Sequence, residues 1–241
     1  MKFTDALISG RLIRRYKRFL ADVQLSEGQV ITAHTANTGA MLGCCEPGSA
    51  VWLSRSDNPK RKYAHTWELV ESGEGSARTL VGINTLRAND LVAEAVKSGR
   101  VDELKRYTSM QKEVRYGSEN SRIDLLLSEA SDKAAAPCYV EVKNVTLAKD
   151  GVGYFPDAKS LRAVKHLREL MLMKTQGARA VIFFCVPRAD VNEVRAADFI
   201  DPDYAAALKN AVEHGVLALA YRARVSPEEI VLQDSIPVVA G

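Results

Sequence analysis

The feature that most constrains the fold is a nearly continuous apolar stretch, which reads AVIFFCV over residues 180–186. Such a run is typical of a strand covered on both faces, as in a parallel sheet flanked by helices. Helical patterns at 157–175 and 202–214 surround it, and a further strand is expected at 216–225. This order predicts an α/β sheet with helices on its faces. The run is also far shorter than the roughly 18 apolar residues that a membrane span requires.

The first third of the chain has a different pattern, with short predicted strands and no helical periodicity. We expect strands at 15–24, 29–33, 50–54, 67–71 and 79–83, with turns at 26–28, 38–39, 46–49 and 73–76. A small barrel of the OB type is one compact solution for such a segment. We therefore expect two domains, 1–83 and 84–241. The predicted fold class is α+β, with a small N-terminal OB-like barrel and a C-terminal α/β domain built on a mixed central sheet.

A predicted helix at 89–98 and extended segments at 113–116, 122–127 and 138–147 precede the apolar strand. In strand geometry alternate side chains share a face. The pattern therefore places Asp124 on the face opposite its apolar neighbours Ile123, Leu125 and Leu127. By the same rule, Glu141 and Lys143 lie together on one face of their strand, opposite Val140 and Val142.

If these two strands are neighbours, Asp124, Glu141 and Lys143 form one charged cluster. Two adjacent carboxylates repel each other, and a hard cation such as Mg²⁺ or Mn²⁺ would relieve that repulsion. Lys143 would reach the same space, where it could orient a water molecule or stabilise a developing oxyanion. Ordinary surface charges on two strands are the alternative interpretation.

The D…E-x-K pattern resembles the PD-(D/E)xK nuclease superfamily, in which an acidic residue precedes an E-x-K strand. The resemblance implies Asp124, Glu141 and Lys143 as catalytic residues, with Asp124 and Glu141 as metal ligands. The superfamily often adds a glutamate from the preceding helix, and Glu94 is the candidate here, with Glu113 as a weaker one.

Longer stretches along essentially the whole chain form a second pattern: RYKRFLADV (15–23), NTGAM (37–41), KRKYAHTWEL (60–69), YGSENSRID (116–124), YVEVKNVTL (139–147), GYFPDA (153–158) and KHLREL (165–170). With these stretches the chain resembles the sugar fermentation stimulation protein A family. The resemblance implies an OB-like N-terminal domain, a nuclease-like C-terminal domain and DNA binding, but no settled reaction. Ala163 stands where the family pattern would have glycine.

The basic residues are unevenly distributed along the chain. Residues 1–83 hold 11 lysines and arginines against 8 acidic residues, whereas residues 84–241 hold 22 of each. Basic grooves with aromatic residues bind nucleic acid backbones and bases. The candidate DNA-binding residues are Arg14, Arg15, Lys17, Arg18, Lys60, Arg61 and Lys62. For the residues at 14–18 the alternative is a solvated edge strand, and for those at 60–62 it is an ordinary surface turn.

The helix expected at 157–175 has an apolar side and a polar side, and His166 lies on the polar side. This histidine could act as a general acid or contact a phosphate, and a polar surface residue is the alternative.

The basic residues near the start of the chain also follow an alternating pattern. In strand geometry, Arg14, Tyr16 and Arg18 share a face.

Two functions remain open from the sequence: a Mg²⁺- or Mn²⁺-dependent DNA phosphodiesterase, and a non-catalytic DNA-binding regulator with a nuclease-like fold. No recognisable helix-turn-helix is present, so DNA binding is expected to be largely non-specific. The N-terminus shows no secretory signal pattern, and the four cysteines show no C-x-x-C pair. We therefore expect a cytoplasmic protein that does not interact with membranes. The oligomeric state stays open, with a homodimer as one option.

Overall fold

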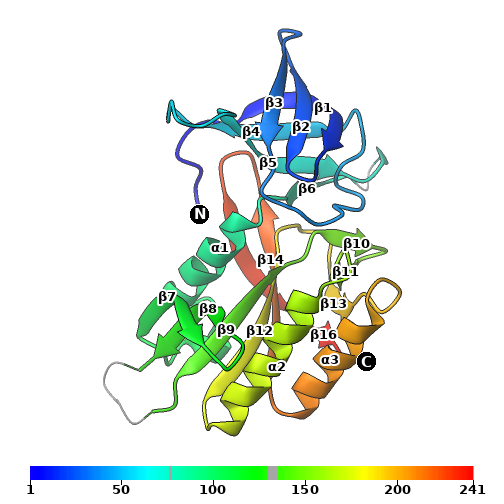
Figure 1. Cartoon of the computed structure of the whole chain (residues 1–241). Coiled ribbons are helices and arrows are strands. Elements are labelled where there is room, and N and C mark those ends of the chain that lie inside the picture. The colour runs from blue at the N-terminus through cyan, green and yellow to red at the C-terminus, as the bar shows by residue number, and fades with distance from the viewer. Residues whose placement is uncertain (76–77, 130–134, 241) are drawn as a thin grey trace.

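The first third of the chain forms a closed five-stranded barrel in the computed structural model, which describes residues 1–75, 78–129 and 135–240 (Figure 1). Its strands are β1 (Ile8–Tyr16), β2 (Leu20–Leu25), β3 (Val30–His34), β4 (Ala50–Arg55) and β5 (His65–Ser72). They pair in the order β3-β2-β1-β4-β5, and β3 also pairs with β5, which closes the barrel. Strand β6 (Thr79–Gly82) continues the sheet beside β5. The prediction of an OB-like barrel is confirmed.

One expected strand, 15–24, is instead a hairpin. Lys17 and Arg18 have positive φ angles of 50° and 63° and reverse the chain between β1 and β2. The expected shared face of Arg14, Tyr16 and Arg18 is therefore wrong beyond Tyr16. Left-handed turns usually contain glycine or asparagine, and neither residue occurs in RRYKRF. Ser76, at the end of another expected turn, lies outside the described residues.

The second domain is built on a mixed six-stranded sheet of order β15-β14-β12-β9-β8-β7. Strands β9 (Cys138–Asn144), β12 (Arg179–Val186) and β14 (Leu217–Val225) are parallel to one another. Strands β7 (Ser109–Tyr116), β8 (Ser121–Ser128) and β15 (Ile230–Ile236) add antiparallel edges. The apolar stretch 180–186 lies within β12 at the centre of this sheet, and all seven of its residues are buried, as its sequence predicted.

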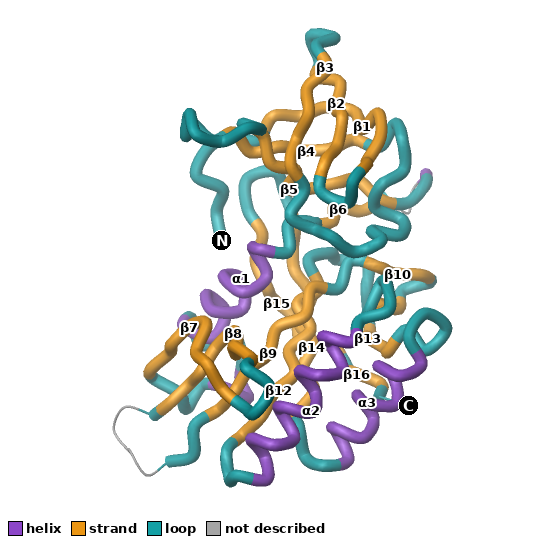
Figure 2. Tube along the Cα trace, viewed as in Figure 1, coloured by secondary structure: helices purple, strands orange, loops and turns teal. Residues whose placement is uncertain are grey.

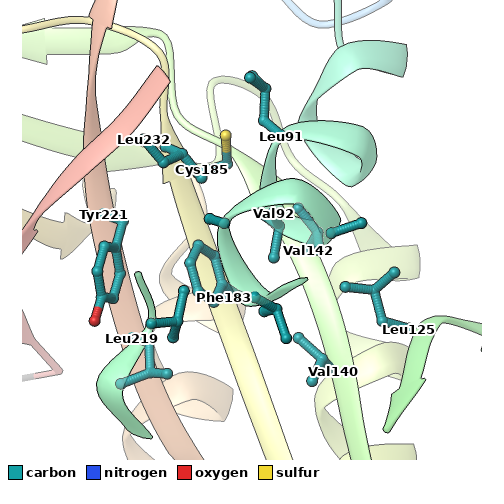
Figure 3. Close-up of a cluster of buried hydrophobic side chains, with 14 of the residues drawn as sticks. Leu91, Val92, Leu125, Val140, Val142, Phe183, Cys185, Leu219, Tyr221 and Leu232 are labelled. Atoms are coloured by element: carbon teal, nitrogen blue, oxygen red, sulfur yellow. The ribbon is translucent and has the colours of Figure 1, made fainter. Parts of the chain in front are cut away.

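Helices cover both faces of this sheet. Helix α1 (Leu86–Lys97) packs on one face, where its apolar side meets a core drawn from β8, β9, β12, β14 and β15 (Figure 3). Helices α2 (Leu161–Thr175) and α3 (Pro202–Glu213) lie side by side and bury a second core on the other face (Figure 2). Serine and aspartate begin these two helices: the side chains of Ser160 and Asp201 accept hydrogen bonds from the first-turn amides of Ala163 and Tyr204.

A smaller sheet and a short helix complete the second domain. The sheet contains β10 (Leu147–Lys149), β11 (Val152–Phe155), β13 (Glu193–Ala196) and β16 (Val238–Val239), in that order. A 3-10 helix, η2, spans Asp102–Leu104. No helix among the described residues is long and apolar enough to cross a membrane.

The two domains are joined by contacts as well as by the chain. The N-terminal ammonium group of Met1 donates to the carbonyl of Ile230 at 2.7 Å, and the Phe3 amide donates to the carbonyl of Glu228. The Gly82 amide at the end of β6 donates to the carbonyl of Pro187. The first residues of the chain therefore pack on the second domain.

Candidate nuclease-like site

Asp124, Glu141 and Lys143 come together where β8 and β9 separate. The pairing of these antiparallel strands ends at Leu125 and Val140. The next amide of β9 on this side, that of Val142, donates to Oδ2 of Asp124 at 2.7 Å instead of to a strand partner. Asp124 thus accepts the bond at the point where the backbone ladder stops.

The expected alternation does not continue through Asp124. Leu125 and Leu127 pack in the core with α1, as expected for one face, but Ile123 packs in the core with α2 and α3. The prediction that Ile123 shares their face is therefore wrong. The separation of the strands at this point accounts for the change, because a strand that leaves its partner no longer keeps the regular pleat.

Glu141 is the centre of a buried hydrogen-bonded group. Its side chain is 3% exposed, and its Oε1 accepts from Lys143 Nζ at 2.6 Å and contacts Nδ1 of His166 on α2. Nε2 of His166 accepts from Nε of Arg162 at 3.4 Å, so we assign the ring proton to Nδ1, which donates to Glu141. His166 is buried, which excludes the alternative of a surface histidine.

The two carboxylates respond differently to this environment. Burial, and then the charge of Glu141, raise the pKa of Asp124 from 3.8 to about 6. Burial also raises the pKa of Glu141, but the charge of Lys143 and the hydrogen bond from His166 outweigh burial and leave that pKa below its ordinary value. Glu141 is therefore ionised at neutral pH, and Asp124 has to ionise beside it.

Helix α1 contributes an amide to this cluster instead of the expected carboxylate. Nδ2 of Asn89 donates to Oδ1 of Asp124 at 2.8 Å. Glu94 lies further along the same helix, where its Oε1 accepts from the Met1 ammonium group at 2.9 Å and lies 3.8 Å from Arg100. The structure therefore does not bring Glu94 together with Asp124 and Glu141. Glu113 lines the same cleft as Asp124 and has a positive φ of 56°.

The donor set suits a hard cation. Asp124 and Glu141 offer carboxylate oxygens, and Oε2 of Glu141 is buried without a hydrogen-bond partner. Within the described ranges, no group of three or more His, Cys, Asp or Glu side chains is arranged to hold a metal ion. A bound cation would therefore complete its coordination with water or substrate oxygens, as Mg²⁺ commonly does.

A cleft of about 420 Å³ opens over Asp124 and His166. Four cationic side chains line it: Arg115, Arg122, Arg162 and Lys165. Arg115 and Arg122 are directly opposite each other in the β7–β8 pairing, while Arg162 and Lys165 come from α2. Arg162 and Lys165 belong, with His166, to the polar side of the helix expected at 157–175, but the sequence could not connect them with Arg115 and Arg122. The β7–β8 pairing was the missing information.

The basic residues of the β1–β2 hairpin differ in where their side chains lie: Arg15 contacts the barrel, whereas Arg14, Lys17 and Arg18 are exposed. Arg15 donates to the carbonyls of Arg18, Asn37 and Gly39 at 2.6–3.0 Å, so it fixes the loop at 36–41. Arg14 is 68% exposed and pairs with Asp22. Lys17 and Arg18 are exposed at the turn.

The second basic segment, Lys60, Arg61 and Lys62, lies in the exposed loop between β4 and β5. Arg61 donates to Oγ1 of Thr66 at 2.9 Å, and Nζ of Lys62 lies 5.5 Å from the centroid of the Tyr63 ring. All three are exposed, so they could reach a nucleic acid backbone. They are far along the chain from the carboxylate cluster, and within the described part of the chain no hydrogen bond or ion pair connects them with it.

Comparison with known proteins agrees with this architecture. Residues 13–83 match the model of the SfsA N-terminal OB domain, and residues 86–229 match the sugar fermentation stimulation protein RE domain. The chain is 56% identical over 238 residues to a sugar fermentation stimulation protein homolog of Shewanella sp. (strain MR-7), covering 99% of both chains. A homolog from Pseudoalteromonas atlantica is 51% identical, covering 99% of this chain and 100% of the relative.

A solved structure has the same fold. The structure of Pyrococcus furiosus SfsA in complex with Ca²⁺ superposes with a TM-score of 0.87 at 23% sequence identity. The match covers 99% of this chain and 98% of the other. At this identity the likeness supports the arrangement of both domains.

Proposed function

Because the chain belongs to the sugar fermentation stimulation protein family, we propose that it binds DNA largely without sequence preference and hydrolyses phosphodiester bonds with Mg²⁺ or Mn²⁺. The observation that carries this proposal is the cluster of Asp124, Glu141 and Lys143 beside a cleft lined by four cations. Those cations would hold a phosphodiester backbone over the two carboxylates.

Each residue of the cluster has a distinct role in this proposal. Asp124 and Glu141 would hold the cation, which when bound supplies charge neutralisation at the phosphate. Lys143 would orient the attacking water and stabilise the charge that develops on a phosphate oxygen. The water oxygen forms a bond to phosphorus as the P–O bond to the sugar breaks. The water loses a proton, and the leaving sugar oxygen gains one from solvent, so the products are one phosphate end and one hydroxyl end. His166 would keep Glu141 in position through its Nδ1 hydrogen bond.

Two further observations support the proposal. The Pyrococcus furiosus protein is described as a complex with Ca²⁺, a cation that takes oxygen ligands as Mg²⁺ does. Among the described residues, all four cysteines are free thiols, which suits the reducing cytoplasm where we propose that the protein acts on DNA.

One observation favours the second candidate, a non-catalytic DNA-binding regulator of sugar metabolism. Lys143 and His166 already contact Oε1 of Glu141, so the charge of this carboxylate is compensated without a cation. A protein that only binds DNA could keep such a cluster as a buried polar network.

The test is a cleavage assay with end-labelled single-stranded, duplex and branched DNA in Mg²⁺, Mn²⁺ or EDTA. We expect cleavage by the wild type with either metal and none in EDTA. Lys143→Ala and Asp124→Ala should bind DNA nearly as well as the wild type but fail to cut, because their roles are in catalysis. Lys97→Ala, at the exposed end of α1, is the matched control and should cut normally. Absence of cleavage with every substrate and both metals would favour the regulator.

A further inference from the structure

A second hollow borders the carboxylate cluster and is lined by residues of both domains. It has a volume of about 230 Å³, and Lys143 and Asn89 form part of its wall. Because Asn89 donates to Asp124 and Lys143 lies 3.2 Å from His166, this interdomain cavity and the cationic cleft flank the same charged group.

The wall that the barrel contributes is held in place from both domains. This wall includes Thr38, in the loop at 36–41. The Met41 amide donates to Oδ2 of Asp157 at 2.9 Å, and Oγ1 of Thr85, the residue before α1, donates to the carbonyl of Ala36. Arg15 binds the same loop from the barrel side. The cavity is therefore a preformed feature of the domain interface.

The chemistry of the interdomain cavity differs from that of the cleft. The cleft has four cations, but among the described residues that line the cavity only Lys143 is cationic. The other polar groups are amides, hydroxyls and the carboxylate of Asp157, which accepts from the Met41 amide, and the rings of Tyr154 and Phe155 complete the lining. Amides and aromatic rings recognise an uncharged planar group with hydrogen-bonding edges, such as a nucleobase.

Two details point to an occupant. Asn144 lines the cavity, and its Nδ2 is buried without a hydrogen-bond acceptor, which is costly unless a ligand or water supplies one. Tyr154 packs edge-on against Phe199, with ring centroids 5.2 Å apart, and Phe199 is 66% exposed. Phe199 lines a neighbouring hollow with Arg195 and Lys209, so aromatic and basic groups continue from the cavity to the surface.

We propose that the interdomain cavity receives one unpaired nucleobase next to the phosphate bound in the cationic cleft, with the strand continuing over Phe199. The substrate would then be single-stranded DNA, or a duplex at a position where one nucleotide is unpaired. The volume is compatible with this choice: about 230 Å³ equals roughly eight waters of about 30 Å³ each, which is space enough for one base. This inference rests on the proposed function.

The test measures binding in EDTA, so that it does not depend on cleavage. A short oligonucleotide carrying 2-aminopurine is titrated with the full-length protein, first as a single strand and then annealed to its complement. We expect quenching of the single strand as the base stacks on Tyr154, and about tenfold weaker binding of the duplex. Asn144→Leu and Tyr154→Ala should weaken single-strand binding by about fivefold or more and reduce the quenching. Their duplex affinity should stay unchanged.

Two further variants keep the test decisive. Thr38→Trp replaces an exposed residue at the cavity wall, so it should block the base without affecting folding. Val212→Ala removes an exposed apolar side chain of α3 outside these hollows and should change nothing. Equal affinity for single strand and duplex, or unquenched 2-aminopurine, would overturn the inference and leave water as the occupant. Quenching and single-strand preference without cleavage in Mg²⁺ or Mn²⁺ would support the inference and reject only the catalytic proposal.

Discussion

The backbone amide of Val142 donates a hydrogen bond to the carboxylate of Asp124, 2.7 Å away and 18 residues earlier in the chain. This bond replaces the next rung of the β8–β9 ladder, whose residue pairs end at Leu125 and Val140. A carboxylate that takes the place of a strand partner is fixed by the sheet itself. The same separation of the strands leaves Asp124 at the base of the cationic cleft.

The raised pKa of Asp124 predicts a pH-dependent stability. A carboxyl whose pKa rises from 3.8 to about 6 on folding binds its proton more tightly in the native state. Its contribution to stability therefore falls as pH increases from about 4 to about 6, by on the order of 3 kcal/mol in total. Asp124→Asn should remove this loss, so its stability relative to the wild type should be higher at pH 7.5 than at pH 4. Urea unfolding in EDTA at both values measures the difference.

The control for this experiment is Asp57→Asn, in the exposed loop after β4. This variant should show nearly the same stability change at both pH values. An Asp124→Asn variant whose effect is equally independent of pH would contradict the expected ionisation of Asp124 beside Glu141.

Asn89, and not Glu94, should influence cation binding. Asn89 holds Asp124 in place, so Asn89→Ala should weaken Mn²⁺ binding by roughly tenfold or more, as is usual for groups that orient metal ligands. Glu94→Gln should leave Mn²⁺ binding unchanged and cost at most about 1 kcal/mol of stability, because it removes a half-exposed ion pair with the N-terminus. Calorimetric titration with Mn²⁺ distinguishes the two. Loss of Mn²⁺ binding in Glu94→Gln would restore the role that the superfamily pattern implies.

Substitutions of two arginines of the β1–β2 hairpin, Arg15 and Arg18, should differ in their effect on stability. Arg15→Ala removes the donor for the Asn37 and Gly39 carbonyls and should lower the free energy of unfolding by about 2–3 kcal/mol. Arg18→Ala, at the exposed turn, should change stability by less than about 0.5 kcal/mol. If the hairpin contacts DNA, Arg18→Ala should also reduce the slope of log affinity against log salt by about one. An unchanged slope would move the DNA contact away from this turn.

Replacing Gly117 with alanine should cost more stability than replacing Gly28, because only Gly117 lies against another side chain. Both Gly117 and Gly28 have positive φ, 70° and 84°. A Cβ at Gly117 would overlap the Glu169 carboxylate, which accepts hydrogen bonds from the Ser118 and Glu119 amides, whereas a Cβ at Gly28 meets nothing within 4 Å. Gly28→Ala should therefore cost about 1 kcal/mol and Gly117→Ala at least about 2 kcal/mol more. Thermal unfolding of both variants measures this, and equal losses would show that φ alone decides.

The sequence by itself determined the elements whose patterns depend on local backbone periodicity. The apolar run at 180–186 predicted a strand covered on both faces, and β12 is buried between helices at the centre of its sheet. Alternation placed Glu141 and Lys143 on one face, and their side chains do meet at 2.6 Å. The short strands and turns of the first third predicted the barrel that the structure contains. For Glu141 and Lys143 the two-residue period of a strand determines which side chains share a face of the sheet.

Only the tertiary structure decided which distant residues complete the cluster. Asn89 and Glu94 lie on one helix, and the docking of α1 against β8 and β9 brings the first to Asp124 and leaves the second with the N-terminus. The four cations of the cleft come from three elements whose pairing and packing bring them to one wall. Arg15 donates to the carbonyls of Asn37 and Gly39, in a loop that no pattern in the sequence connects with it. Such contacts depend on how separate segments pack, and periodicity within one segment carries no information about that packing.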